Sequence, residues 1–290
     1  MSADDVLGLP MPWPAPAKLN LCLHIVGRRP DGYHLLQSAI QFIDLCDEIT
    51  FHERDPGVIE RLEGPVEVSA DHDLVVRAAR ALAKHANLRR GVGIALNKCI
   101  PMQAGLGGGS SDAATVLVAL NELWDVHLPI GELADLGLKL GADVPVFVRG
   151  CSAWVEGVGE QLTAQDYPEA FYVVLKPSAN ISTVDIFQAA ELTRNSPITT
   201  IRAFLAGGGR NDCTSTVRGR YPDVAEALDW LGNFGSAKLT GTGACVFAEV
   251  RDQSAGAKVL AQLPARWQGY LVRSLNRSPL LDRLAEERNS

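Results

Sequence analysis

A glycine-rich loop that ends in two hydroxyl side chains is the stretch of this chain best suited to chemistry. Four of the residues 105–109 are glycines, and Ser110 and Ser111 follow directly. Glycines let a bulky anion approach the backbone and allow positive φ. A helix start adds backbone N–H groups and the positive end of a dipole. The loop therefore predicts a phosphate-binding site, with a flexible surface turn as the alternative.

Two common phosphate-binding motifs do not fit this loop. A P-loop needs G-x-x-x-x-G-K-[ST], which occurs nowhere in the sequence. A dinucleotide-binding loop needs G-x-G-x-x-G, and counting from Gly105 puts Ser110 at its last position. The predicted phosphate site therefore belongs to another class.

Several other polar residues allow both a structural and a chemical interpretation. Lys18 and Asn20 share one face at the start of an alternating strand, and Asp143 stands between a glycine-ended helix and an apolar run. Tyr33 and His34 follow a Pro-Asp-Gly turn. By themselves these patterns favour an edge lysine, a solvated asparagine, a turn carboxylate and an exposed hairpin tip. An aromatic ring and an imidazole on a rigid turn would also suit a flat ligand ring.

The element that must position the glycine loop is a buried helix directly after it. One apolar stripe at helical spacing predicts this helix, and it comprises Ala113, Val116, Leu117, Leu120 and Trp124. The side chains of Ser110, Ser111 and Asp112 are expected to cap its first turn. Alternation over residues 92–96 predicts a strand before the loop.

Strands and helices alternate along the rest of the chain, which predicts an α+β protein. Expected strands cover residues 16–27, 38–51, 152–162, 171–175, 244–250 and 269–274. Expected helices cover residues 71–86, 183–192, 222–231 and 253–263. The pattern breaks near residues 161–170. We therefore expect an N-terminal domain of residues 1–160 and a C-terminal domain of residues 161–290.

Composition excludes several classes of protein. The net charge of −7 argues against non-specific nucleic-acid binding. No apolar run approaches the roughly 18–20 residues that span a membrane, and the acidic, proline-rich N-terminus is unlike a signal peptide. The six cysteines are scattered without a C-x-x-C pair, which favours free thiols in a reducing cytoplasm. The histidines lack metal-ligand spacing, so no structural zinc is expected.

Three segments together resemble the GHMP small-molecule kinases. They are the strings PAKLNL at residues 16–21, PMQAGLGGGSSDAA at residues 101–114 and LTGTGAC at residues 239–245. The resemblance implies a two-domain α+β GHMP kinase fold. Its N-terminal domain would be similar to domain 2 of ribosomal protein S5, and its C-terminal domain would be ferredoxin-like.

The strings RRPDGYH and LGADVPVF narrow the resemblance to one branch of that family. This branch transfers the γ-phosphate of ATP to the 2-hydroxyl of diphosphocytidyl methylerythritol, in the non-mevalonate route to isoprenoids. The resemblance implies ATP as co-substrate, with Mg²⁺ whose protein ligands stay unassigned. The oligomeric state stays open. A mevalonate-type kinase would not need the cytosine-binding turn, and a non-catalytic nucleotide-binding regulator would not need Lys18 and Asp143.

The resemblance also implies a role for each candidate residue. Asp143 would be the general base, and Lys18 would stabilise charge at the attacking oxygen. The residues implied in acceptor binding are Asn20 at the substrate hydroxyls, Tyr33, His34 and Phe187 at the cytosine ring, and Thr183. The ATP phosphates would bind the loop residues Pro101, Met102, Gln103, Ala104, Gly105, Leu106, Gly107, Gly108, Gly109, Ser110 and Ser111.

Overall fold

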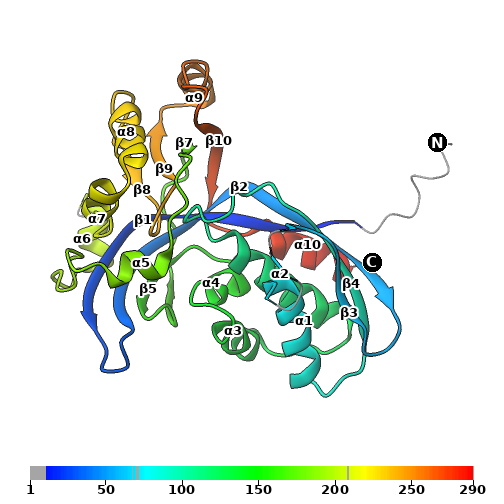
Figure 1. Cartoon of the computed structure of the whole chain (residues 1–290). Coiled ribbons are helices and arrows are strands. Elements are labelled where there is room, and N and C mark those ends of the chain that lie inside the picture. Colours follow the sequence, from blue (N-terminus) through cyan, green and yellow to red (C-terminus); the bar gives the residue numbers. More distant parts are fainter. Residues whose placement is uncertain (1–10, 67, 70–71, 208, 290) are drawn as a thin grey trace.

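The computed structural model describes residues 11–66, 68–69, 72–207 and 209–289 (Figure 1). The first part of the chain forms a mixed sheet with helices packed on one face. Its strands are β1 (Trp13–Arg28), β2 (His34–Arg54), β3 (Ile59–Glu63), β4 (Gly91–Asn97), β5 (Ala153–Gly157) and β6 (Gln161–Ala164). Its helices are α1 (Leu74–His85), α2 (Gly108–Leu123), α3 (Ile130–Leu138) and α4 (Val144–Arg149).

The second part begins at β7 and also alternates strands and helices. Its strands are β7 (Phe171–Lys176), β8 (Lys238–Leu239), β9 (Val246–Val250) and β10 (Gln268–Leu275). Its helices are α5 (Thr183–Gln188), α6 (Ile201–Leu205), α7 (Thr214–Arg220), α8 (Pro222–Leu231), α9 (Gln253–Leu260) and α10 (Pro279–Arg288). The α+β alternation expected from the sequence is therefore observed in the described residues.

The long hairpin of β1 and β2 runs across the whole molecule (Figure 1). Most of β1 and the middle of β2 are buried on both faces, so the polar face expected on the first strand is covered as well. The Pro-Asp-Gly turn joins the two strands antiparallel. Besides β1, strand β2 pairs with β4, β5 and β10. The hairpin is therefore the common frame of both parts, and its tip carries Tyr33 and His34.

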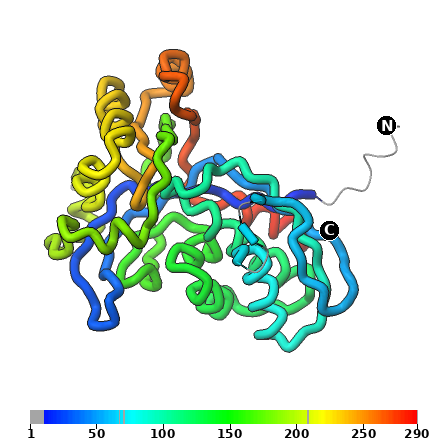
Figure 2. The backbone as a smooth tube through the Cα atoms, viewed as in Figure 1, coloured from blue at the N-terminus to red at the C-terminus, as the bar shows by residue number. Residues whose placement is uncertain are grey.

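Strand β10 connects the two parts into one continuous sheet. Along the order β3-β4-β2-β10-β7-β9-β8, β10 pairs with β7 over most of its length and with β2 at its end. The chain then returns to the first part, because α10 lies against β1 and α2 (Figure 2, where α10 is red). The two ends of the described chain thus pack together.

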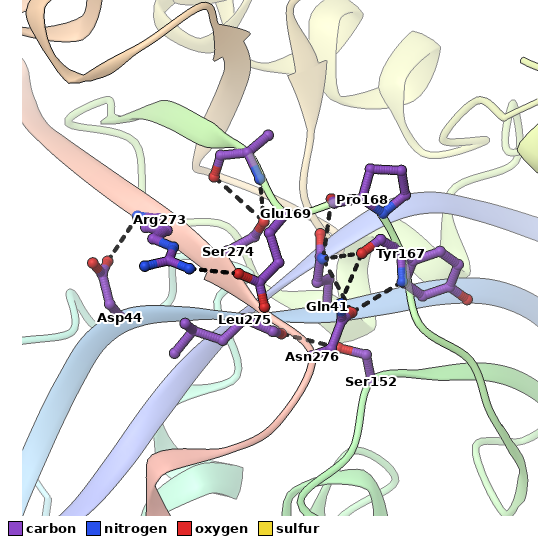
Figure 3. Close-up of polar contacts among 11 residues, drawn as sticks. Gln41, Asp44, Ser152, Tyr167, Pro168, Glu169, Arg273, Ser274, Leu275 and Asn276 are labelled. Atoms are coloured by element: carbon purple, nitrogen blue, oxygen red, sulfur yellow. Dashed lines mark hydrogen bonds and ion pairs between the residues drawn. The ribbon is translucent and has the colours of Figure 1, made fainter.

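Side-chain hydrogen bonds fix the segment between β6 and β7 to the end of β10 (Figure 3). The Asn276 amide donates to Tyr167 O at 2.8 Å, and its oxygen accepts from Tyr167 N at 3.0 Å and from the Gln41 amide at 3.2 Å. The Arg273 guanidinium lies 2.8 Å from the Glu169 carboxylate. The two parts are therefore held by polar contacts as well as by the sheet. The boundary at 160/161 falls at the β5–β6 hairpin and stays a prediction.

Helix α2 is the centre of the first hydrophobic core. The stripe expected from the sequence is buried, and so is every residue from 111 to 121. Helices α1, α3, α4 and α10 and the β1–β2 hairpin surround it. Because α2 is covered on all sides, its N-terminus is held rigidly at the glycine loop.

Four local predictions need correction. The strand expected at residues 152–162 is instead a hairpin of two antiparallel strands, β5 and β6. Helix α2 begins at Gly108, so Ser110, Ser111 and Asp112 lie inside it and do not cap it. The helix expected at 183–192 ends at Gln188, because the backbone leaves the helical conformation at Ala189, whose ψ is 131°. Helix α1 begins at Leu74, with Asp73 as its N-cap; the expected start, Asp71, lies outside the described residues. In the described part of the chain, no helix has both the length and the apolarity that a membrane crossing requires.

Candidate active site

The glycine loop ends at a helix start whose N–H groups are not capped by a side chain. Gly107 is the N-cap of α2, with φ of 75°, and as a glycine it has no side chain to cap the first turn. The first backbone N–H groups of a helix have no partner within the helix. Together with the helix dipole, they form a site for an anion such as phosphate.

Backbone contacts hold this loop between β1 and the segment 240–245. Leu106 O accepts from Lys18 N at 2.9 Å, and Ala104 O accepts from Cys245 N at 3.0 Å. Gly105 has a φ of 74°, and a Cβ there would stand 2.3 Å from Thr240 O. Only glycine fits at that position, so the third sequence motif supports the phosphate loop directly.

Lys18 and Asp143 meet at the wall of the site. The Lys18 ammonium lies 3.6 Å from Asp143 Oδ2 and donates to Asn20 Oδ1 at 2.5 Å and to Gly105 O at 2.9 Å. Burial lowers the pKa of Lys18, and the Asp143 carboxylate opposes that shift. The Lys18 side chain is 3% exposed and that of Asp143 40%. The arrangement provides a fixed cation beside an accessible carboxylate.

Asn20 is fixed by its neighbours on β2 and in the segment 240–245. Its amide Nδ2 donates to Ser38 Oγ at 2.8 Å, and its backbone N donates to Thr240 Oγ1 at 3.1 Å. Its side-chain oxygen is therefore held towards the Lys18 ammonium. The shared face of Lys18 and Asn20 that the strand pattern predicted is confirmed.

A cavity of about 580 Å³ connects these groups. It is lined by most of the candidate residues, namely Lys18, Asn20, Pro101, Met102, Gln103, Ala104, Gly105, Leu106, Gly107, Gly108, Gly109, Ser110, Asp143, Thr183 and Phe187. Ser111, Tyr33 and His34 are not among its lining residues. Ser111 is fully buried in α2. One cavity thus brings together the glycine loop, the Lys18–Asp143 pair and some of the residues predicted to bind an acceptor.

The remaining acceptor-binding candidates lie where the hairpin tip meets α5. The rings of His34 and Phe187 stack with centroids 5.0 Å apart and planes 27° apart. Thr183 Oγ1 lies 2.9 Å from Thr242 Oγ1, which connects α5 to the glycine segment 241–243. Tyr33 is 65% exposed at the hairpin tip. The structure therefore brings His34 and Phe187 together, whereas Tyr33 faces solvent.

Two groups of functional interest were missed by sequence reasoning. Lys98 bonds the carboxylates of Asp47 and Asp112, the latter at 2.8 Å, and a Cβ on Gly108 would stand 3.2 Å from its ammonium. Arg194 bonds His34 and three backbone carbonyls around the end of α5. Their partners are distant in sequence or are backbone atoms, so no local pattern indicates them.

No protein metal centre is found in the described part of the chain. It holds no cluster of three or more histidine, cysteine, aspartate or glutamate side chains suited to a metal ion. The carboxylates of Asp47 and Asp112 that approach each other are already bonded by Lys98.

Comparison with known proteins gives consistent matches over nearly the whole chain. The family model described as "GHMP kinases N terminal domain" matches residues 73–151, and "GHMP kinases C terminal" matches residues 189–269. A 4-diphosphocytidyl-2-C-methyl-D-erythritol kinase of Nitrosococcus oceani is 53% identical over 270 residues, covering 93% of this chain and 96% of the relative. The protein of the same name from Thiobacillus denitrificans is 54% identical over 274 residues, covering 94% and 99%.

Solved structures show the same similarity. A crystal structure of 4-(cytidine 5'-diphospho)-2C-methyl-D-erythritol kinase superimposes with a TM-score of 0.80 at 31% identity, covering 91% of this chain and 99% of that one. The mevalonate kinase of Methanococcus jannaschii gives a TM-score of 0.71 at 17% identity, covering 93% and 100%. This second likeness concerns the fold alone.

Proposed function

The chain belongs to the GHMP kinase family, and on that premise we propose that it transfers the γ-phosphate of ATP to the 2-hydroxyl of 4-diphosphocytidyl-2-C-methyl-D-erythritol. The α+β GHMP kinase fold predicted from the sequence is confirmed by the same matches. This reaction belongs to the non-mevalonate route to isoprenoid precursors. The observation that carries the proposal is that one cavity is lined by the Lys18–Asp143 pair, the glycine loop and Phe187.

The Lys18–Asp143 pair would perform the chemical step. The acceptor oxygen forms a bond to the γ-phosphorus while the bond to the β–γ bridging oxygen breaks, and ADP leaves. The hydroxyl proton passes to the Asp143 carboxylate, whose exposure lets the acceptor reach it. The Lys18 ammonium, fixed by Asn20 and Gly105, stabilises negative charge at the attacking oxygen.

The loop at residues 101–111 would bind the β- and γ-phosphates of ATP. The uncapped N–H groups at the start of α2 suit the phosphate oxygens, and Ser110 adds a hydroxyl at the cavity wall. Ser111 is buried, so its contribution is to the packing beneath the loop. Mg²⁺ would arrive bound to ATP and neutralise phosphate charge. The described residues offer no three-carboxylate cluster for it, so phosphate oxygens and water would supply most of its ligands.

The hairpin tip and α5 would select the acceptor. Phe187 lines the cavity and stacks on His34, which gives a flat apolar surface with a polar edge for the cytosine ring. Tyr33 would cover the outer face of the ring by moving in from its exposed position. Asn20, which is bonded to Lys18, would contact the hydroxyl-bearing part of the acceptor, and Thr183 would contact the acceptor elsewhere in the same cavity.

The division of the chain at 160/161 and a cytoplasmic location are part of the same proposal. Residues 1–160 would carry the ATP-binding domain, and residues 161–290 would contribute the acceptor-binding α5. All six cysteines are free thiols, which suits a reducing compartment.

An acceptor panel tests this function. The protein is incubated with ATP and Mg²⁺ and with one of four alcohols: diphosphocytidyl methylerythritol, mevalonate, homoserine or galactose. We expect ADP release only with the first, and a new phosphate monoester on its 2-hydroxyl by ³¹P NMR. ADP release with mevalonate alone would assign the chain to another branch of the family. Absence of release with all four, from folded protein that binds ATP, would contradict a kinase function.

A further inference from the structure

Arg194 holds the two sides of the acceptor-binding region together. Its guanidinium donates to the carbonyls of Phe187 at 3.0 Å, Ala189 at 2.6 Å and Leu192 at 3.1 Å. Its Nε donates to His34 Nε2 at 3.1 Å. One side chain therefore uses both arms and its Nε to connect the end of α5 to the tip of the β1–β2 hairpin.

The bond between Arg194 and His34 determines where the imidazole carries its proton. A guanidinium has only N–H donors and stays charged at any pH at which the protein is folded. His34 Nε2 must therefore present a lone pair, so a neutral His34 carries its proton on Nδ1. Burial lowers the pKa of His34, and the nearby charges of Arg194 and Arg28 lower it further. The neutral ring is thus the form present near neutral pH.

We propose that Arg194 is a positioning residue that fixes the Nδ1–H tautomer of His34 and thereby favours an acceptor carrying cytosine over one carrying uracil. The N3 atom of cytosine is a hydrogen-bond acceptor, whereas N3 of uracil carries a proton. A donor at His34 Nδ1 matches the first base and opposes the second. Arg194 also bonds the backbone carbonyl of Phe187, whose ring stacks on His34. The same side chain therefore fixes both the Phe187 ring and the His34 imidazole.

This role rests on the proposed function, because it assigns His34 to the base of the acceptor. Its first test needs no substrate. The full chain is labelled with ¹⁵N-histidine, and His34 is assigned by comparison with a His34→Gln variant. At pH 7 we expect a pyrrole-type Nδ1 and a pyridine-type Nε2 in the wild-type protein. An Nε2–H or doubly protonated ring would overturn the proposal, whatever the protein phosphorylates.

The second test measures binding without turnover. Calorimetric titrations with cytidine diphosphate and uridine diphosphate are compared for the wild-type protein, Arg194→Gln and Arg194→Lys. The cytidine preference should fall by about 3–10-fold in both variants, the worth of one hydrogen bond. The exposed Arg202 on α6 provides the matched control, and Arg202→Gln should keep the preference.

The two tests separate selection from simple structural support. Equal weakening of both nucleotides in the Arg194 variants, with an unchanged His34 tautomer, would show that Arg194 only holds the end of α5 and would overturn the proposal. A wild-type protein that binds both diphosphates equally would overturn it too. Failure of the phosphoryl-transfer assay with an intact cytidine preference would contradict the proposed reaction and leave the role of Arg194 supported.

Discussion

The Lys18 ammonium lies 3.6 Å from the Asp143 carboxylate, at the point where β1 passes the start of α4. An ammonium has three N–H donors. Asn20 and Gly105 accept two of them, so one is left for Asp143 or for an oxygen of the bound substrates. Because Gly105 belongs to the glycine loop, Lys18 links that loop directly to the Asp143 carboxylate.

Replacing Asp143 with asparagine should remove the proton acceptor and keep the shape of the site. We expect kcat to fall by about 10²–10⁴, the usual contribution of a general base. ATP affinity should change little, because the phosphate loop is untouched. Steady-state ADP release and calorimetric ATP binding measure the two effects. Asp135→Asn, at an exposed position on α3, is the control. Full turnover by folded Asp143→Asn would exclude the base role.

Replacing Lys18 with alanine should affect both catalysis and stability. The variant leaves the buried Asn20 Oδ1 without its Lys18 donor, while Gly105 O keeps only the hydroxyl of Thr240, and we expect a loss of about 1–3 kcal/mol of unfolding free energy. It also removes the charge beside the attacking oxygen, so kcat should fall more than ATP binding weakens. Urea unfolding and initial-rate kinetics check the two parts, with the exposed Lys139→Ala as control. A rise in the KM for ATP alone would make Lys18 a binding residue.

The sequence predicts those parts of the site whose residues are close together in the chain and form a recognisable pattern. The glycine loop and the buried helix after it are adjacent in the chain, so composition and spacing were sufficient. Lys18 and Asp143 are far apart in the sequence, and each alone favoured a structural interpretation. Only the resemblance to the GHMP kinases, to which PAKLNL and LGADVPVF both contribute, placed them in one site. Their catalytic roles stay predictions, although their proximity is now observed.

The incorrect or missing predictions have physical causes. Serines and an aspartate normally cap a helix, but Gly107 takes the N-cap position of α2 and leaves the first N–H groups open. Local capping propensity is thus overridden by the tertiary contacts of the loop, which bonds Lys18 N through Leu106 O and Cys245 N through Ala104 O. Arg194 was missed because three of its four partners are backbone carbonyls. Every residue has such a carbonyl, so the side-chain pattern does not indicate which ones a guanidinium bonds.

The close approach of Gly105 to the segment 240–245 predicts that alanine is not tolerated there. Its φ of 74° costs a side-chain-bearing residue about 1–3 kcal/mol. The added Cβ would also meet Thr240 O at 2.3 Å, so the loop must move. We expect a lower melting temperature and a kcat/KM for ATP reduced at least about tenfold, since 1.4 kcal/mol of lost binding corresponds to that factor. Gly131→Ala is the control, because nothing lies within 4 Å of its added Cβ. Its melting temperature and its kcat/KM for ATP should equal those of the wild type. Normal ATP kinetics in Gly105→Ala would show that the loop geometry is not required.

The carboxyl group of Asp112 should make stability fall as pH rises. Burial raises its pKa from 3.8 to about 8, the Asp47 charge adds to this shift, and Lys98 opposes it. Between these two pH values the folded protein holds a proton that the unfolded chain has released. Folding therefore binds protons, and the contribution of Asp112 to the unfolding free energy decreases from about pH 4 to pH 8 and is level above that.

Asp112→Asn keeps the size of the side chain and cannot titrate. Its stability relative to wild type should increase by more than about 1 kcal/mol over this range, as a shift of at least one pKa unit requires. Urea unfolding at pH 5, 6.5 and 8 measures the difference, with Asp135→Asn as an exposed control. Parallel stability curves for wild type and Asp112→Asn would show that Asp112 is charged in the folded protein throughout.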